Sequence, residues 1–146
     1  MTYFEIGIYC PRHEENIGTL WRSAYQLGAA GVFVIGGPKL RKQTSDVLNV
    51  ERRIPLRHYP DFSAFLAARP VGAQLIAVEM GGVPLATFVH PNLALYLLGS
   101  ESNGLPPDVL KACQQVVEIE SVNYPSYNVA VSGSILMYHR YITVSR

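Results

Sequence analysis

The stretch Gly31-Val-Phe-Val-Ile-Gly36 places four consecutive apolar residues between two glycines. A strand with one solvated face would carry polar residues at every second position, and this stretch carries none. Short, wholly apolar runs are typical of strands that are buried on both faces in a parallel sheet. The stretch therefore predicts a parallel sheet with helices packed on both sides.

The rest of the chain alternates similar apolar runs with helical patterns. Further strands are predicted at residues 4–10, 74–80, 93–98 and 116–119. Helices are predicted from Asn16, as the N-cap, to Gly28, and at residues 61–68, 106–115 and 128–142. Gly81-Gly82 indicates a turn that ends a strand, and residues 38–60 are polar without a clear period. This order predicts one α/β domain over residues 1–146, with a mostly parallel sheet flanked by helices.

Composition limits the classes of function. The chain has 146 residues, with twelve Lys and Arg against eleven Asp and Glu, so its formal net charge is only +1. A strongly basic protein and an acidic disordered tail are both excluded. Charged residues make up 16%, below the ~25% of an average soluble domain, while apolar residues make up 49%. This surplus predicts a very buried interior or an apolar face that binds a second copy of the chain.

The sequence predicts a cytoplasmic protein without a metal site. The N-terminus lacks a signal peptide, and no apolar run reaches the ~18–20 residues of a membrane span. Cys10 and Cys113 are too few for a disulfide scaffold or a zinc site, and we expect two buried, reduced thiols. The four histidines show no metal-ligand spacing. Glycine-rich dinucleotide and nucleotide motifs and the G-x-S-x-G element of hydrolases are also absent.

Three segments at predicted strand ends remain as candidates for a site. They are Asn16-Ile-Gly-Thr-Leu-Trp-Arg22, Leu98-Gly99-Ser-Glu101-Ser-Asn-Gly104-Leu105, and Ser126-Tyr-Asn128-Val129. Each has a structural explanation as a helix cap or a tight turn. Ligands in α/β proteins, however, bind at the carboxyl edge of the sheet, where all three are expected. There Arg22 could bind a phosphate or a reacting hydroxyl group, and Gly99 would allow a ligand to approach the backbone.

In their order and spacing the three segments resemble the motifs of the SpoU/TrmH branch of the SPOUT RNA methyltransferases. The resemblance covers nearly the whole chain. It implies that the α/β fold carries a deep C-terminal trefoil knot, an exception to the rule that connections do not thread loops. It also implies S-adenosylmethionine as cofactor, a homodimer, and methylation of a ribose 2′-hydroxyl group. The short chain is most similar to minimal members that modify the tRNA anticodon loop, with rRNA as the other possible substrate.

The resemblance also implies roles for single residues. Arg22 matches the arginine at the reacting hydroxyl group, and Asn16, Glu101, Ser126 and Asn128 match the other catalytic positions. The matching cofactor contacts are Val78, Gly99, Ile119 and Ser126. The chain departs from the family where Ile119-Glu-Ser replaces Ile-Pro-Met, where the next loop is about one residue shorter, and at the bulky Tyr127. A guanidinium group is effectively never deprotonated, so we expect Arg22 to bind the neighbouring phosphate rather than to act as a base.

A basic segment predicts the contact with RNA. Half of the twelve basic residues lie between residues 39 and 57, namely Lys39, Arg41, Lys42, Arg52, Arg53 and Arg57. A local patch of this kind can bind phosphates although the net charge is close to zero. His58 and Tyr59 extend it with rings that can stack on unpaired bases.

Two other functions remain open on the sequence. The chain could be a knotted dimer that binds RNA or the cofactor without methylating, which the altered loop at residues 119–127 would favour. It could also be an unrelated flavodoxin-like nucleotide-binding domain, in which case the three motifs would be coincidental. For the dimer face we expect the first and last helices, with Trp21, Met137, Tyr138 and Tyr141.

Overall fold

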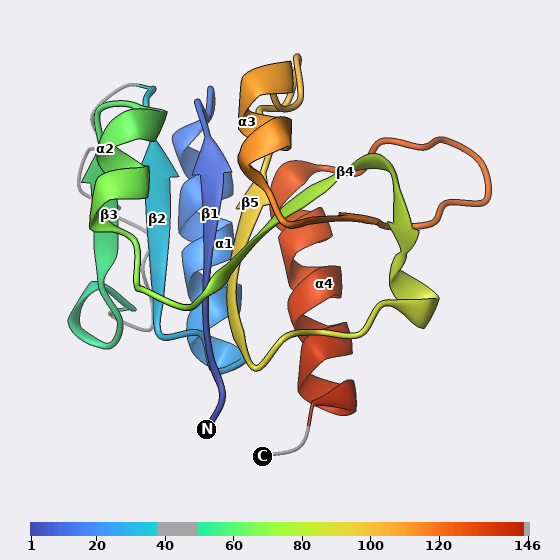
Figure 1. Ribbon diagram of the computed structural model, residues 1–146, viewed down its shortest axis with the longest axis horizontal. Helices are drawn as coiled ribbons and strands as arrows, with labels where there is room; N and C mark the ends of the chain where they lie inside the picture. Colours follow the sequence, from blue (N-terminus) through green and yellow to red (C-terminus); the bar gives the residue numbers. More distant parts are fainter. Residues whose placement is uncertain (38–49, 145–146) are drawn as a thin grey trace.

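A computed structural model describes residues 1–37 and 50–144 of the chain. Its six strands form one parallel sheet in the order β3-β2-β1-β5-β4-β6 (Figure 1). The strands are β1 (Tyr3–Tyr9), β2 (Gly31–Ile35), β3 (Leu56–Tyr59), β4 (Gln74–Pro84), β5 (Leu93–Leu98) and β6 (Gln115–Glu118). The strand order reverses between β1 and β5. The parallel α/β fold predicted from the sequence is therefore confirmed.

Helices cover both faces of the sheet and enclose two separate cores. On one face, α1 (Glu14–Gln26) and α4 (Val129–Thr143) pack against each other, and on the opposite face lie α2 (Phe62–Ala68) and α3 (Pro107–Ala112) (Figure 1). Leu20 and Leu136 belong to the first core, and Phe65 and Val109 to the second. Two short 3₁₀ turns, η1 (Val50–Arg52) and η2 (Leu85–Thr87), lie in the connections. No helix in the described ranges is long and apolar enough to cross a membrane.

The start of α1 differs from the prediction. The helix begins at Glu14 with His13 as its N-cap residue, so Asn16 lies inside the first turn and does not cap it. Its side chain is instead bonded to two distant residues of the site. Gly28 does follow the helix, with a φ of 88° that favours glycine. The α4 prediction is correct, because the Asn128 side chain accepts hydrogen bonds from the backbone N–H groups of Ala130 and Val131.

The end of β4 also differs from the prediction. Gly81-Gly82 does not end the strand, because β4 continues to Pro84. Val78 and Val83 both pair with Val117 of β6, so residues 79–82 form a bulge between them. Since bulges re-aim side chains, this one carries Glu79 and Met80 away from the regular strand. The α3 helix is shorter than predicted and ends at Ala112.

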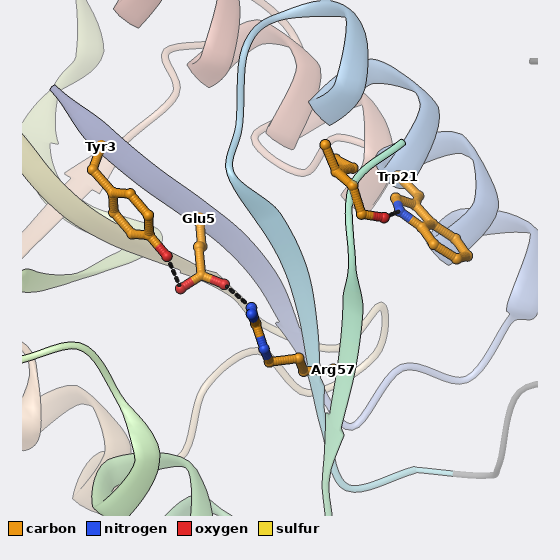
Figure 2. A network of polar contacts seen from close by, with 5 residues as sticks. Tyr3, Glu5, Trp21 and Arg57 are labelled. Carbon is orange, nitrogen blue, oxygen red and sulfur yellow. Dashed lines mark hydrogen bonds and ion pairs between the residues drawn. The ribbon is translucent and has the colours of Figure 1, made fainter. Parts of the chain in front are cut away.

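The third strand was missed by sequence reasoning. Only four residues long, β3 lies at the edge of the sheet and exposes Arg57 and His58. Figure 2 shows how Glu5 on β1 reaches Arg57: Arg57 Nη1 donates to Glu5 Oε1 at 2.9 Å, and the Tyr3 hydroxyl donates to Glu5 Oε2 at 2.9 Å. Between them on β2 lies Gly31, where a Cβ atom would come within 3.0 Å of the carboxylate. Because Gly31 has no side chain, the ion pair between Glu5 on β1 and Arg57 on β3 can form across β2.

This network changes the titration of Tyr3 and pairs a buried carboxylate with a cation. Burial, reinforced by the hydrogen bond to Glu5, raises the pKa of Tyr3 to about 12. Glu5 is only 5% exposed, and Arg57 provides the opposite charge that burial of a carboxylate requires. Trp21 lies in the same region and donates its indole N–H to the carbonyl oxygen of Ile54 (Figure 2).

A second buried polar cluster fixes α4 to the sheet. Arg140 on α4 is 3% exposed and donates to the carbonyl oxygens of Pro91 and Asn92 and to the Tyr96 hydroxyl group. His90 lies 2.6 Å from that hydroxyl oxygen and 2.8 Å from His139 Nδ1. Burial, followed by the nearby His139 and Arg140, lowers the pKa of His90 to about 4.

Two further predictions about burial need correction, those for Met137 and for the two cysteines, and two other residues expected at the surface are partly packed. Met137 is fully buried in the chain's own core and cannot contribute to a dimer face, and Trp21 is half-buried against that core. The Tyr59 ring is half-buried and packs edge-on against Phe65. Both cysteines are free thiols as expected, but they are only half-buried.

Candidate functional site

A cavity of about 320 Å³ opens at the carboxyl ends of β4, β5 and β6. It is lined by the three strand ends, the loop after β5, the loop before α4 and the first turn of α4: Val78, Glu79, Met80, Leu98, Gly99, Ser100, Glu101, Ser102, Asn103, Gly104, Glu118, Ile119, Pro125, Ser126, Tyr127, Val129 and Ser132. All four residues proposed as cofactor contacts are in this wall. This is the sheet edge at which parallel α/β proteins bind ligands.

A chain of hydrogen bonds joins the three sequence motifs beside this cavity. Asn16 Nδ2 donates to Glu101 Oε1 at 2.9 Å, and Asn128 Nδ2 donates to Asn16 Oδ1 at 3.0 Å. Asn128 Oδ1 in turn accepts from the first turn of α4. Because the three side chains come from α1, the β5–α3 loop and the start of α4, these bonds fix the loop and both helices relative to one another. We refer to Asn16, Glu101 and Asn128 as the polar relay.

Glu101 remains ionised within this relay. Burial alone would raise the pKa of its carboxyl group, but hydrogen bonds from the Asn16 side chain and from backbone N–H groups outweigh burial and hold the pKa below its usual range. One of those N–H groups belongs to Arg12, at 3.0 Å from Glu101 Oε2. A charged acceptor strengthens each of these bonds, so the carboxylate rigidly positions the loop that follows β5.

Gly99 is required by the close approach of two backbone segments. A Cβ atom at this position would lie 2.6 Å from the carbonyl carbon of Gly104 and 3.0 Å from the Leu105 nitrogen. Gly104 itself has a φ of 65° and lies against the Glu79 carboxylate. The two glycines therefore allow the loop to fold back on itself and form one wall of the cavity.

The structure does not bring every candidate residue to the cavity. Arg22 lies on the exposed surface of α1, outside the cavity wall, and forms no hydrogen bond or ion pair within residues 1–37 and 50–144. Arg52 and Arg53 are exposed at and just after η1, whereas Arg57 is engaged by Glu5. Lys39, Arg41 and Lys42 lie outside the described residues.

Sequence reasoning missed three charged residues at this site. Arg12 Nη1 donates to the Ser102 hydroxyl oxygen at 2.9 Å, which ties the loop after β1 to the loop after β5. Glu79 and Glu118 line the cavity from the bulge of β4 and the end of β6. All three directly follow predicted strands or lie within them, and charged residues at strand ends are the signal that could have identified them.

The wall of the cavity combines apolar side chains, hydroxyl groups and carboxylates. A volume of this size is at the lower end of the range for organic ligands. Within the described ranges no three His, Cys, Asp or Glu side chains are grouped so that they could bind a metal ion. The site is therefore suited to a small organic molecule that has an apolar part and polar or positively charged groups.

Comparison with known proteins gives consistent results for sequence and structure. The family model described as the SpoU rRNA Methylase family matches residues 4–138. The chain is 30% identical over 142 residues to the tRNA (cytidine(34)-2′-O)-methyltransferase of Ancylobacter novellus, an alignment covering 90% of this chain and 87% of the other. It is also 29% identical over 133 residues to an uncharacterized tRNA/rRNA methyltransferase of Archaeoglobus fulgidus, and this alignment covers 86% of this chain and 58% of the other.

Solved structures share the fold over nearly the whole chain. A structure reported as giving insights into the 2-OH methylation of C/U34 on tRNA superposes with a TM-score of 0.83 at 26% identity, covering 97% of this chain and 91% of that one. The SpoU methyltransferase AviRb from Streptomyces viridochromogenes, in complex with the cofactor AdoMet, superposes with a TM-score of 0.84 at 22% identity. This superposition covers 96% of this chain and 60% of that one. The latter comparison supports the fold alone.

Proposed function

The chain belongs to the SpoU rRNA methylase family, and we propose that it transfers a methyl group from S-adenosylmethionine to the ribose 2′-hydroxyl group of nucleotide 34 in tRNA. The observation that carries this proposal is the polar relay, in which all three motifs meet beside one cavity. The position on tRNA is proposed from the 30% identical relative, which is named for cytidine 34. A tRNA substrate also implies that the protein works in the cytoplasm.

The cavity fits S-adenosylmethionine in size and chemistry. Val78, Leu98, Ile119 and Val129 offer apolar contacts for the adenine ring, while the hydroxyl groups of Ser100 and Ser126 offer hydrogen bonds. When bound, the cofactor supplies a methyl group on a positively charged sulfur. The contribution of the protein is to hold the acceptor hydroxyl group in line with that methyl group and to exclude water.

Arg22 is proposed to act on the RNA rather than on the cofactor. Since its guanidinium group is exposed and unpaired within the described residues, it is available to bind the phosphate next to the reacting ribose. A fixed cation there favours loss of the hydroxyl proton, which leaves to the phosphate or to water. The fixed donor geometry of arginine suits this task, and lysine would not reproduce it. Arg52 and Arg53 are proposed to bind more distant phosphates, together with Lys39, Arg41 and Lys42 of the same basic segment, whereas Arg57 is held by its ion pair with Glu5.

We further propose that two copies of the chain associate through α4. This helix exposes Val131, Tyr138 and Ile142 to 45%, 57% and 57%, spaced seven and four residues apart along one stripe. Tyr141 stacks on Tyr138 with 6.2 Å between the ring centroids, which enlarges the apolar area. The trefoil knot expected from the family would lie where the chain passes from β6 into α4, around the cavity.

The alternative is a knotted dimer that binds RNA or the cofactor without catalysis, and one experiment separates the two functions. Titration calorimetry with S-adenosylmethionine should show binding, and methyl-labelled cofactor with tRNA that lacks modification at nucleotide 34 should yield a 2′-O-methylated nucleoside at that position. Binding without transfer would support the alternative. A label on a base atom or at another nucleotide would contradict the proposed reaction or its position.

A further inference from the structure

The wall of the cavity is acidic. It contains Glu79, Glu101 and Glu118, and among its described residues it contains no Lys, Arg or His. Apolar side chains and glycines make up much of the remaining wall, so these carboxylates are partly shielded from water. In such surroundings a carboxylate interacts with a nearby charge more strongly than it would in bulk water.

The three carboxylates are not equivalent. Glu101 belongs to the polar relay, where Asn16 Nδ2 donates to one of its carboxylate oxygens and the Arg12 backbone N–H donates to the other. Glu79 and Glu118 have no ion-pair partner within the described ranges. Glu101 likewise has no ion-pair partner there, but its carboxylate holds the polar relay together, which leaves Glu79 and Glu118 as the two carboxylates free of that role.

Backbone hydrogen bonds hold both of these carboxylates in place. Glu79 Oε2 accepts from the Leu105 N–H at 3.0 Å, and Glu118 Oε1 accepts from the Gly81 N–H at 2.6 Å. Both residues follow the paired valines Val78 and Val117 on adjacent strands. The bulge of β4 thus brings two fixed negative charges to one side of the cavity.

We propose that Glu79 and Glu118 make this cavity select the positively charged methyl donor over its neutral demethylated product. This inference rests on the proposed function, because it takes S-adenosylmethionine as the occupant of the cavity. Donor and product share the adenosine, the ammonium group and the carboxylate, and they differ in the methyl group and in the charge on sulfur. Loss of that charge removes the attraction to Glu79 and Glu118, so methyl transfer itself weakens binding and favours release of the product.

The test is titration calorimetry of the 146-residue chain with three ligands. These are S-adenosylmethionine, S-adenosylhomocysteine, and sinefungin, which carries an ammonium group in place of the sulfonium. The wild type should bind both cationic ligands more tightly than S-adenosylhomocysteine. The ratio of the affinity for each cationic ligand to the affinity for S-adenosylhomocysteine should fall as the salt concentration is raised. Glu118→Gln and Glu79→Gln should each lower the ratio about fivefold, equal to about 1 kcal/mol, because they weaken the two cationic ligands more than S-adenosylhomocysteine.

A matched control lies on the same connection. Glu120 accepts from the Ala86 N–H but is not part of the cavity wall, so Glu120→Gln should leave the ratio unchanged. Equal affinity of the wild type for donor and product would overturn the inference, as would ratios unchanged in both cavity variants. These outcomes leave the proposed function standing, whereas failure of all three ligands to bind the folded wild type would contradict the cofactor itself. Circular dichroism of each variant checks that it is folded.

Discussion

Asn128 uses both ends of its side-chain amide. The oxygen caps α4, and the nitrogen donates to Asn16 and so joins α4 to the polar relay. Structural and site-forming roles are therefore combined in one residue. Two substitutions can separate them, because aspartate retains the capping oxygens and loses the donor, while alanine loses both.

We expect Asn128→Ala to lower the free energy of unfolding by about 1–2 kcal/mol through loss of the cap. Asn128→Asp should cost less, about 0.5–1 kcal/mol, because a carboxylate also caps well near the positive end of a helix and only the hydrogen bond to Asn16 is lost. Both variants should weaken cofactor binding, since each breaks the bond to Asn16. Urea unfolding and calorimetry measure the two effects. Wild-type affinity in Asn128→Asp would show that the relay does not support the cavity.

At the scale of elements, α4 depends on a close approach at Gly133. A Cβ atom there would come within 3.1 Å of Leu98 Cδ1 and 3.3 Å of Ile6 Cδ1, and closer still to Leu20 Cδ1 of α1. This glycine therefore lets α4 lie directly on α1 and the sheet. It is buried in the middle of the helix, where glycine is otherwise unfavourable.

Gly133→Ala sets two effects of opposite sign against each other. Alanine favours the helix by about 1 kcal/mol, while overpacking of a tight core costs about 1–3 kcal/mol. Because the contact with Leu20 is so short, we expect net destabilisation of about 1 kcal/mol, measured by urea unfolding. The same change in a Leu20→Ala background should be neutral or stabilising, since the methyl group that it meets has been removed. Equal effects in the two backgrounds would argue against this packing.

The sequence predicted those elements whose signal is local. β2, β5 and α4 lie where apolar runs and the Asn128 cap indicated, because burial on both faces and capping leave a direct pattern in neighbouring residues. β3 escaped prediction because the ion pair that secures it joins Arg57 to Glu5, 52 positions away. The bulge of β4 escaped for a similar reason, since Val83 resumes its pairing with β6 after four intervening residues.

The candidate site was predictable in its parts and not in its geometry. The motifs contained Asn16, Glu101 and Asn128, but Asn16 also fits the pattern of a helix cap. Only the fold shows that its amide binds Glu101 and Asn128 instead. Glu79 and Glu118 belong to no motif, and they reach the cavity through strand pairing that a sequence does not display.

At the scale of the whole molecule, the His90 cluster makes stability depend on pH. The pKa of His90 is about 4 in the folded chain against 6.5 for an ordinary histidine. Between these values the unfolded chain binds a proton that the folded chain does not, so stability falls as the pH is lowered from 6.5 towards 4.

Between pH 7 and pH 5, protonation of His90 in the unfolded chain should lower the free energy of unfolding by about 2 kcal/mol, because each pH unit below 6.5 corresponds to about 1.36 kcal/mol. Urea unfolding at the two pH values measures this loss, which His90→Gln should largely abolish even though its stability at pH 7 is lower. Glu101 does not interfere, because its hydrogen bonds lower its pKa and the stability that it contributes is lost only when the pH falls into the range where carboxyl groups become protonated. An unchanged pH dependence in His90→Gln would rule out this residue as the cause.

Association of two chains offers an explanation for the position of Arg22 outside its own cavity. In a symmetric dimer built on α4, Arg22 of one protomer can serve the cavity of the other. We expect Arg22→Ala and Gly99→Ala each to be inactive as pure dimers, the first with normal cofactor affinity. After exchange of subunits, about a quarter of the sites would carry neither change, and activity should return to about that level.

Two controls accompany this mixing experiment. Tyr138→Glu should give a monomer in analytical ultracentrifugation, while Tyr124→Glu, at a more exposed tyrosine outside α4, should remain a dimer. No recovery of activity in exchanged mixtures would show that Arg22 acts within its own protomer.

The polar relay also has a consequence for the order of events during folding. Its two bonds connect residues 85 and 112 positions apart, from near the beginning, the middle and near the end of the chain. Contacts between such distant residues form slowly, because long loops must close before any bond is gained. Cofactor binding therefore requires that α4 has docked, and no partly folded species should bind the cofactor. In a refolding experiment the appearance of bound cofactor would mark the final phase, after most of the secondary structure has formed.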